Sequence, residues 1–394
     1  MNKIYFDHAA TTPLDKSVLE KMLPYFTDIA GNANSQHFFG REAMKAVDEA
    51  RDKIASLIGA KPSEIYFTSG GTEADNWALR GSANINAHKG KHLIITKIEH
   101  AAMLSTAADL EKQGFEITYL GVDENGLISL EELENSIRED TIFIGVMYAN
   151  NEVGTIQPIK EVAQIAKKHG IPCFTAAVKA MGAIRINVKE LGVDMMSFSA
   201  HKFYGPKGIG ALYVRNGLPL GRLIMGGHQE RTKRGGTTNV PAVVGFAEAL
   251  SIAYGEIERN AEYVSSLRDA FVKRVEAEIP YVKYNGHRTN RLPNNADFSF
   301  EYIEGESILF SLDLAGIAVS SGSACSSGSL EPSHVLLAMG VDEALAHGSI
   351  RFTFGKHNTM EEVNYAVDTL KEIISRLREM SPLFAEIEGE VKNV

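Results

Sequence analysis

Lys202 lies in a segment of the sequence that could support amine chemistry. It follows the mostly apolar run 193–198, which predicts a buried strand, and precedes a turn that contains Gly205 and Pro206. We therefore expect the lysine at the carboxyl end of a strand, where open α/β sheets bind their ligands. A desolvated, neutral amine there could form a Schiff base with an aldehyde, whereas a lone lysine more often extends its charge into solvent.

A glycine pair, Gly70 and Gly71, follows a predicted strand at 64–68 and opens a predicted helix at 70–84. Backbone N–H groups at the start of a helix bind phosphate, and glycine lets an anion approach closely. The segment is neither a Walker A loop nor a dinucleotide fingerprint, and an ordinary capped helix start would also explain it. Together with Lys202 it predicts an aldehyde cofactor that carries one phosphate, namely pyridoxal phosphate.

Three further polar residues are candidates for the same site. His100 follows a predicted strand at 92–96 and could stack on a ring or move protons, although a solvated histidine is the ordinary alternative. Asn151 follows a predicted strand at 141–148 and could hydrogen-bond a ring oxygen, or belong to a plain turn. Arg351 has apolar neighbours, so its guanidinium needs a carboxylate, either from the protein or from a substrate.

The glycine-rich basic loop at 226–237 could bind an anion or be an ordinary solvated loop. The two cysteines of the chain occupy different settings. Cys173 begins an apolar strand and is expected to be a buried packing residue. Cys325 lies in a serine- and glycine-rich segment at 320–329, so we expect an exposed thiol on a mobile loop. A disulfide framework is not indicated.

The composition is that of an ordinary soluble globular protein, with 394 residues, 44% of them hydrophobic and 23% charged. A net charge of −10 argues against direct nucleic-acid binding as the main role. No apolar run approaches the roughly 18 residues of a membrane span, and the first residues lack the apolar region of a secretory signal. No metal site is indicated, and we expect a cytoplasmic protein.

Strands and helices alternate between residues 64 and 199, which predicts a mainly parallel sheet with helices on both faces. The composition changes after residue 259, and a long amphipathic helix at 247–275 bridges this point. We therefore expect a large domain at 16–259 and a smaller α+β domain formed by 1–15 and 260–394. The expected elements of the smaller domain are strands at 282–284 and 297–300 and helices at 306–315 and 360–379.

Six blocks of the sequence, in order along the chain, resemble those of the NifS/IscS-type cysteine desulfurases of the pyridoxal-phosphate fold-type I superfamily. Six blocks in order are far more specific than any single one. The resemblance implies a fold-type I α/β enzyme that forms a homodimer and converts L-cysteine to L-alanine while a cysteine takes the sulfur as a persulfide. The blocks are residues 5–12, 68–76, 150–155, 199–202, 234–237 and 323–326.

The resemblance also implies catalytic and substrate-binding roles. Lys202 would hold the cofactor covalently and later move protons, and His100 would stack on its ring. Cys325 would attack the sulfur of the cysteine-derived intermediate. Asn32 and Arg351 would hold the carboxylate of the substrate.

Further residues would bind the cofactor by the same resemblance. Asn151 would contact the ring oxygen, where Lys179 could add a positive charge. Thr237 would reach the phosphate of a neighbouring subunit. Within one subunit, the phosphate would be bound by Gly71, Thr72, Ser199 and His201.

Two positions depart from the family pattern. Ala176 stands where the family has an aspartate that pairs with the pyridine nitrogen, and Lys179 stands where it has a glutamine. Without the carboxylate, the protonated ring, which is the stronger electron sink, is less favoured. Our hypothesis is that the cofactor still binds but that carbanion steps are slowed or redirected. Restoring both residues is expected to raise turnover.

The resemblance implies a sulfur-acceptor protein as partner, such as an iron–sulfur scaffold, or delivery to a tRNA thiolation pathway. Two alternatives remain at this point. One is a pyridoxal-phosphate C–S lyase that acts on cysteine or cystine and does not need Cys325. The other is a weakened homologue with a binding or regulatory role, because Ala176 replaces the aspartate.

Overall fold

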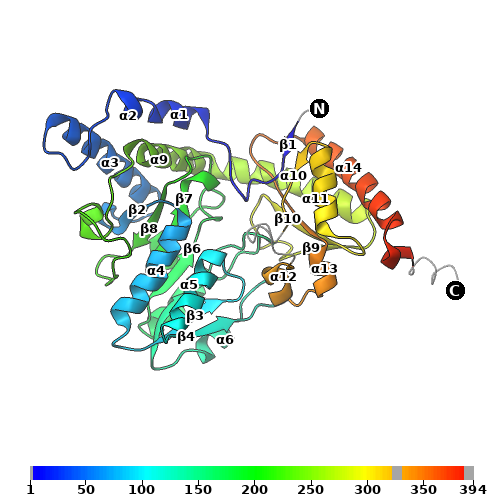
Figure 1. Cartoon of the computed structure of the whole chain (residues 1–394), viewed down its shortest axis with the longest axis horizontal. Coiled ribbons are helices and arrows are strands. Elements are labelled where there is room, and N and C mark those ends of the chain that lie inside the picture. Colours follow the sequence, from blue (N-terminus) through cyan, green and yellow to red (C-terminus); the bar gives the residue numbers. More distant parts are fainter. Residues whose placement is uncertain (1–2, 322–330, 386–394) are drawn as a thin grey trace.

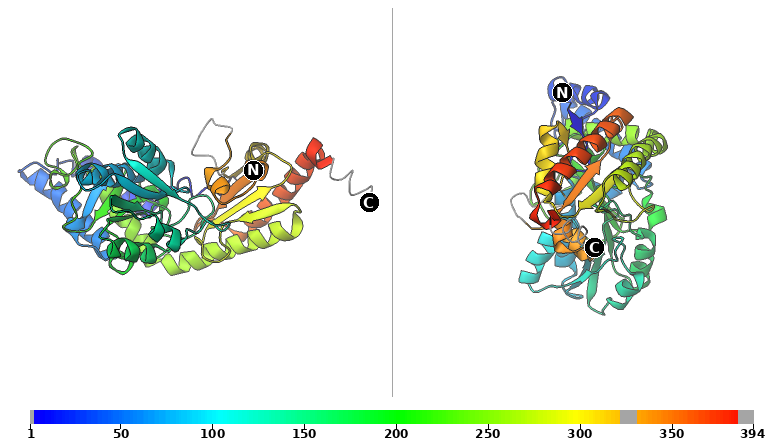
Figure 2. Two further views of the ribbon diagram at one scale, coloured as in Figure 1. Left: turned by 90° about the horizontal axis from the view of Figure 1, so that it is seen from below. Right: turned by 90° about the vertical axis from the view of Figure 1, so that its right-hand side faces the viewer.

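The computed structural model describes residues 3–321 and 331–385, so Cys325 lies outside the described residues. A large sheet with its helices forms one end of the molecule, and smaller sheets with their own helices form the other end (Figure 1). The long helix α10 (Ile257–Glu278) extends from the first end into the second (Figure 2).

The large sheet has seven strands in the order β2-β8-β7-β6-β5-β3-β4. Strand β8 is antiparallel to both of its neighbours, and all the other pairs are parallel. The prediction of a mainly parallel sheet is thus confirmed, although β8 was not predicted. The strands are β2 (Ile65–Thr68), β3 (His92–Thr96), β4 (Glu116–Leu120), β5 (Thr141–Gly145), β6 (Cys173–Ala176), β7 (Met195–Ser199) and β8 (Gly210–Val214).

Helices cover both faces of this sheet, as the alternation predicts. The sheet contributes to two separate apolar cores, one on each face. One core includes buried residues of α3, α7 and α9, and the other includes buried residues of α4 and α5. Helix α7 illustrates the cause, because its buried residues recur at the spacing of one helix face. The helices of this end are α1 (Lys16–Met22), α2 (Pro24–Thr27), α3 (Phe38–Leu57), α4 (Gly71–Asn86), α5 (Ala101–Lys112), α6 (Leu130–Asn135), α7 (Ile159–Lys168), α8 (Val188–Leu191) and α9 (Val240–Gly255).

The other end contains an antiparallel sheet of β9 (Val282–Asn285), β10 (Asn295–Phe300) and β12 (Ser349–Thr353). The first strand of the chain, β1 (Ile4–Tyr5), pairs with β11 (Ile317–Ala318), and Phe6 is buried in the same core. This contact agrees with assigning the N-terminal segment to the smaller domain, but the boundaries at 15 and 259 stay a prediction. The helices here are α10, α11 (Gly305–Leu314), α12 (His334–Ala338), α13 (Glu343–His347) and α14 (Met360–Glu379).

The predicted single helix at 247–275 is wrong. Two helices, α9 and α10, replace it, and they are bent by 72° at their junction. Glu256 between them has φ −122° and ψ 9°, which is not helical, and it follows Gly255, a poor helix former. Within residues 3–321 and 331–385, no single helix is long and apolar enough to cross a membrane, and only this bent pair has the length and composition when taken together.

The basic loop at 226–237 is fixed by two ion pairs to the helices α3 and α4 and by one hydrogen bond to β2. Glu230 binds Arg51 at 2.8 and 2.9 Å and also accepts the N–H of Phe67 at 3.0 Å. Arg234 binds Glu73, in the first turn of α4, at 2.8 and 2.9 Å. The guanidinium of Arg234 is therefore already paired with a protein carboxylate, and anion binding by this loop stays a prediction.

We expect Glu230→Gln to lower the free energy of unfolding by about 3 kcal/mol, because it leaves the buried guanidinium of Arg51 without its anion. The side chains of Arg51 and Glu230 are only 10% and 6% exposed. Urea unfolding of both proteins measures the change. Glu258→Gln is the matched control. The side chains of Glu258 and Arg185 are 73% and 56% exposed, so their ion pair should contribute nothing measurable to the free energy of unfolding. Equal stability of Glu230→Gln and the natural protein would contradict the expectation.

Candidate active site

Most of the predicted site residues lie at the carboxyl ends of strands of the large sheet, where open α/β sheets bind ligands. Lys202 ends a short 3-10 turn (Ala200–Lys202) that continues β7. His100 caps α5 just after β3, and Gly71 opens α4 just after β2. Ser199 ends β7, and Asn151 lies in the turn after β5. The prediction that Lys202 follows a buried strand is confirmed.

The ammonium group of Lys202 lies against the N-terminal segment. Its Nζ donates to the carbonyl oxygens of Ala9, at 2.8 Å, and Ala10, at 2.5 Å. The Nζ of Lys179 donates to the same carbonyl of Ala9. Both lysines line a hollow of about 950 Å³, part of it open to solvent, which also contacts Asn151. The structure thus brings two lysines together at one backbone oxygen.

The glycine turn before α4 packs closely on the end of β7. A Cβ atom added to Gly71 would lie 2.8 Å from Cγ2 of Val178 and 3.8 Å from Cβ of Ser199. A larger residue would therefore push the turn away from Val178, and the backbone amides of Gly71 and Thr72 would move with it. The turn and Ser199 together form a small cradle at the start of a 16-residue helix, which is suited to a phosphate.

Thr237 lies on the anchored basic loop and not in the hollow that holds the lysines. It lines a second hollow, of about 530 Å³, together with Thr68 and Ser69 of the glycine turn. A role for Thr237 at the phosphate of a neighbouring subunit stays a prediction.

Two histidines of the site are neutral at pH 7. Burial, followed by the charges of Lys179 and Lys202, lowers the pKa of His100 to about 4. Burial and the same two lysines also lower the pKa of His201 to about 4. His100 Nδ1 accepts the N–H of Ala102 at 3.1 Å, which requires the lone pair of a neutral ring at that nitrogen. An uncharged His100 ring is suited to stacking on an aromatic cofactor.

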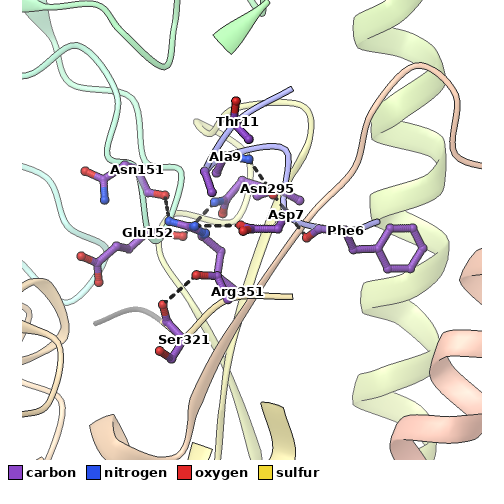
Figure 3. Close-up of polar contacts among 12 residues, drawn as sticks. Phe6, Asp7, Ala9, Thr11, Asn151, Glu152, Asn295, Ser321 and Arg351 are labelled. Atoms are coloured by element: carbon purple, nitrogen blue, oxygen red, sulfur yellow. Dashed lines mark hydrogen bonds and ion pairs between the residues drawn. The ribbon is translucent and has the colours of Figure 1, made fainter. Parts of the chain in front are cut away.

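Arg351, on β12, is buried and already has protein partners (Figure 3). Its Nη1 donates to the carbonyl of Asn151 at 2.9 Å, and its Nη2 lies 3.1 Å from Asp7 Oδ1. The sequence left open whether the carboxylate partner of Arg351 comes from the protein or from a substrate. The structure shows a protein carboxylate, that of Asp7. Among the described residues, no acceptor binds the buried Nε, and binding of a substrate carboxylate by Arg351 stays a prediction.

The segment that carries Cys325 begins beside Arg351. Arg351 N donates to the carbonyl of Ser320 at 2.7 Å, and Ser321 lies next to Arg351 in Figure 3. Ser321 is the last residue described before Cys325, and the description resumes at residue 331. Cys173, in contrast, is buried at the start of β6, as predicted, and burial raises the pKa of its thiol.

Asn32 is not brought to Arg351 within this chain. It is exposed in the loop between α2 and α3, where its Oδ1 accepts the N–H of Asn34 at 2.9 Å. These helices lie at the opposite end of the molecule from α11, α13 and α14 (Figures 1 and 2). Its assignment to the substrate carboxylate stays a prediction.

Several buried acids near the site were not foreseen. Ser197 donates to Asp75 at 2.5 Å, and burial raises the pKa of Asp75 to about 7. Ser197 is the strand partner of Ala176, so this carboxyl lies close to the position that lacks the family's aspartate. Burial also raises the pKa of Glu99, beside His100, to about 8. Asp75 lies beyond the first turn of α4, whose acidic residue is Glu73, and the sequence offered no signal for it.

Asp7 was also missed as a functional residue. In the sequence it is one residue of the block at 5–12, and its carboxylate could have been paired with Arg351. The signal was weak, because it required knowing that β1 joins the small sheets.

Comparison with known proteins shows the family. Residues 4–366 match the aminotransferase class-V family model. The chain belongs to this family. Cysteine desulfurase IscS of Dictyoglomus turgidum is 54% identical over 380 residues, which cover 96% of each chain, and IscS of Methanosarcina thermophila is 51% identical over 96% of this chain and 94% of its own. A solved NifS-like protein superposes with a TM-score of 0.90 at 42% identity, covering 95% of this chain and all of its own.

Class-V aminotransferase-family proteins of the desulfurase type use pyridoxal phosphate, and most of this site fits that group. The cradle of Gly71 and Ser199 suits the phosphate, and the half-buried amine of Lys202 suits the aldehyde. Ala176, 6% exposed at the end of β6, offers no carboxylate to the ring nitrogen. The residues therefore fit the phosphate and the aldehyde of the cofactor. At its ring nitrogen, however, position 176 provides no negative charge.

Proposed function

We propose that the protein is a pyridoxal-phosphate-dependent cysteine desulfurase that converts L-cysteine to L-alanine and stores the sulfur on Cys325 as a persulfide. The observation that carries this proposal is Lys202 at the carboxyl end of β7, beside the cradle at α4, in a chain 54% identical to a cysteine desulfurase. A C–S lyase and a regulatory homologue are not favoured, since the similarity to desulfurases extends over nearly the whole chain.

The residues of this chain would hold the cofactor at four places. The amides of Gly71 and Thr72, with Ser199 and His201, would bind the phosphate. Lys202 would bind the aldehyde and move protons, and His100 would stack on the ring. Asn151 and Lys179 would contact the ring oxygen. When bound, the cofactor supplies the electron sink for cleavage of the bond between carbon and sulfur.

The reaction balances with the groups that the chain provides. Arg351 would hold the substrate carboxylate with its guanidinium, whose Nη2 is paired with Asp7 at 3.1 Å and whose Nε has no acceptor among the described residues. The carbon–sulfur bond of cysteine breaks as the thiolate of Cys325 forms a sulfur–sulfur bond. The proton that completes alanine is delivered by Lys202, and the persulfide remains on the enzyme.

We propose a homodimer, a cytoplasmic location and a sulfur-acceptor protein, such as an iron–sulfur scaffold, as parts of the same function. The hollow beside Thr237, separate from the lysine hollow, supports a contribution across subunits. Exposed Leu23, Phe26, Phe38 and Phe39 on α2, α3 and the residue before α2 offer an apolar surface for a second copy.

The products of cysteine breakdown test this function. Incubation of the full chain with L-cysteine and a reductant should yield alanine and sulfide in equal amounts. Elimination by a C–S lyase would instead give pyruvate and ammonia with the sulfide. Pyruvate as the main carbon product would therefore overturn the proposal.

We expect Ala176→Asp to raise turnover by roughly ten- to a hundredfold, since a charge-assisted bond to the ring nitrogen is worth roughly 1.5–3 kcal/mol. Steady-state alanine formation measures it. Substitution of position 176 alone separates the carboxylate from any effect of Lys179. Ala176→Asn is the matched control, because it adds similar bulk without charge and should gain little. The same turnover in both variants would contradict the role of the carboxylate.

A further inference from the structure

The Lys202 turn, residues 200–205, contains a strained residue. Tyr204 has φ 64°, which lies in the left-handed region that a bulky side chain rarely adopts. Such strain persists only where the surrounding structure holds it, and it is concentrated at functional sites. We propose that Thr12 and Tyr204 are positioning residues, which hold the turn in the conformation that directs the amine of Lys202 at the cofactor. The inference rests on the proposed function in taking Lys202 as the residue that binds the aldehyde.

The hydroxyl of Thr12 bridges the backbone on the two sides of Lys202. It donates to the carbonyl of His201 at 2.9 Å and accepts the N–H of Tyr204 at 2.7 Å. The backbone N–H of Thr12 donates to the same carbonyl of His201 at 3.0 Å. Thr12 is only 3% exposed, so water cannot readily replace a bond that is lost here. One side chain therefore fixes a backbone group before the lysine and another after it.

Tyr204 is also held from two other segments. Its carbonyl accepts the N–H of Asp15 at 3.0 Å, and its hydroxyl accepts the N–H of Lys356 at 2.9 Å. The ammonium of Lys356 lies 4.7 Å from the centre of the tyrosine ring and is paired with Asp15 at 2.7 Å. Lys356 comes just after β12, the strand that carries Arg351. These contacts hold the left-handed conformation and tie the Lys202 turn to the smaller sheets.

The phosphate cradle is held by other contacts. Gly71 opens α4, and Ser199 is the last residue of β7, where the sheet pairs it with Gly210. Lys202 lies beyond the end of this strand, and its four-carbon side chain is flexible. Loosening the turn should therefore displace the amine of Lys202 while the phosphate keeps its place.

Two forms of the cofactor separate positioning of the amine from binding of the phosphate. The aldehyde of pyridoxal phosphate condenses with the lysine amine with loss of water, whereas pyridoxine phosphate carries an alcohol there and binds only non-covalently. Equilibrium dialysis against the cofactor-free full chain gives both dissociation constants. Thr12→Val should weaken pyridoxal phosphate binding by about tenfold and change pyridoxine phosphate binding by less than twofold. Thr12→Ser, which keeps the hydroxyl, should bind both as the natural protein does.

Thr141→Val is the matched control, because Thr141 is 7% exposed and its hydroxyl also has two partners. It accepts the N–H of Arg138 at 2.8 Å and lies 2.7 Å from His92 Nδ1, at the start of β5 and thus away from the carboxyl ends of the strands. Neither dissociation constant should change in this variant. Circular dichroism confirms each fold.

If Thr12→Val does not fold, Tyr204→Phe is compared in its place. This variant removes the hydroxyl that accepts the N–H of Lys356, and we expect about threefold weaker binding of pyridoxal phosphate alone.

Weakening of both compounds to the same extent, or of neither, would overturn the proposal. Because no cysteine is turned over, either result would leave the desulfurase function untouched. Borohydride reduction and mass spectrometry of the natural protein locate the attached cofactor. Its absence from the Lys202 peptide would contradict the proposed function, and this inference with it.

Discussion

Lys202→Arg is expected to lower the rate of alanine formation from cysteine by roughly a thousandfold or more. An arginine keeps the positive charge and can still donate to the carbonyls of Ala9 and Ala10, so the fold should persist. It cannot lose its proton at neutral pH, so it can neither bind the aldehyde covalently nor move protons as a base. Steady-state alanine formation at saturating cysteine measures the loss.

The cofactor provides a second measurement on the same variant. The natural protein should be yellow and should be bleached by borohydride, which fixes the cofactor to the Lys202 peptide. Lys207→Arg is the matched control, because Lys207 is exposed and lies in the same turn. Substantial turnover by Lys202→Arg would show that another amine carries the reaction.

Cys325→Ser should abolish persulfide formation while leaving the cofactor bound. The substrate sulfur then has no thiolate to accept it, and a serine hydroxyl is not a nucleophile toward sulfur under these conditions. Mass spectrometry of the intact protein after incubation with cysteine, without reductant, detects the added sulfur. Unchanged sulfur loading in this variant would exclude Cys325 as the carrier.

Cys173→Ala is the matched control for that experiment. Cys173 is buried, and burial raises the pKa of its thiol, so it forms little thiolate at neutral pH. We expect this variant to load sulfur on Cys325 as the natural protein does. The two variants together separate the proposed carrier from the remaining thiol of the chain.

The parts of the fold that depend on local pattern could be predicted from the sequence. The alternation of apolar strands and amphipathic helices indicated the parallel sheet, and strand ends located Lys202 and His100. The break between α9 and α10 was missed, because apolar residues continue at helical spacing on both sides of Gly255. The antiparallel β8 was missed because pairing between distant strands is not a local property.

The site was predictable where a residue type carries its own chemistry. The association of Asp7 with Arg351 was not, because it depends on β1 pairing with β11 and on Phe6 entering the small core. The meeting of Lys179 and Lys202 at Ala9 has the same origin. These contacts join segments far apart in the chain, and only the packed structure brings them together.

A single turnover tests the central claim most directly. One equivalent of L-cysteine is added to the cofactor-loaded full chain without reductant, and alanine and the mass of the Cys325 peptide are measured in the same sample. We predict one alanine for each Cys325 peptide that becomes heavier by one sulfur atom. Pyruvate and free sulfide with an unmodified Cys325 peptide would contradict a desulfurase.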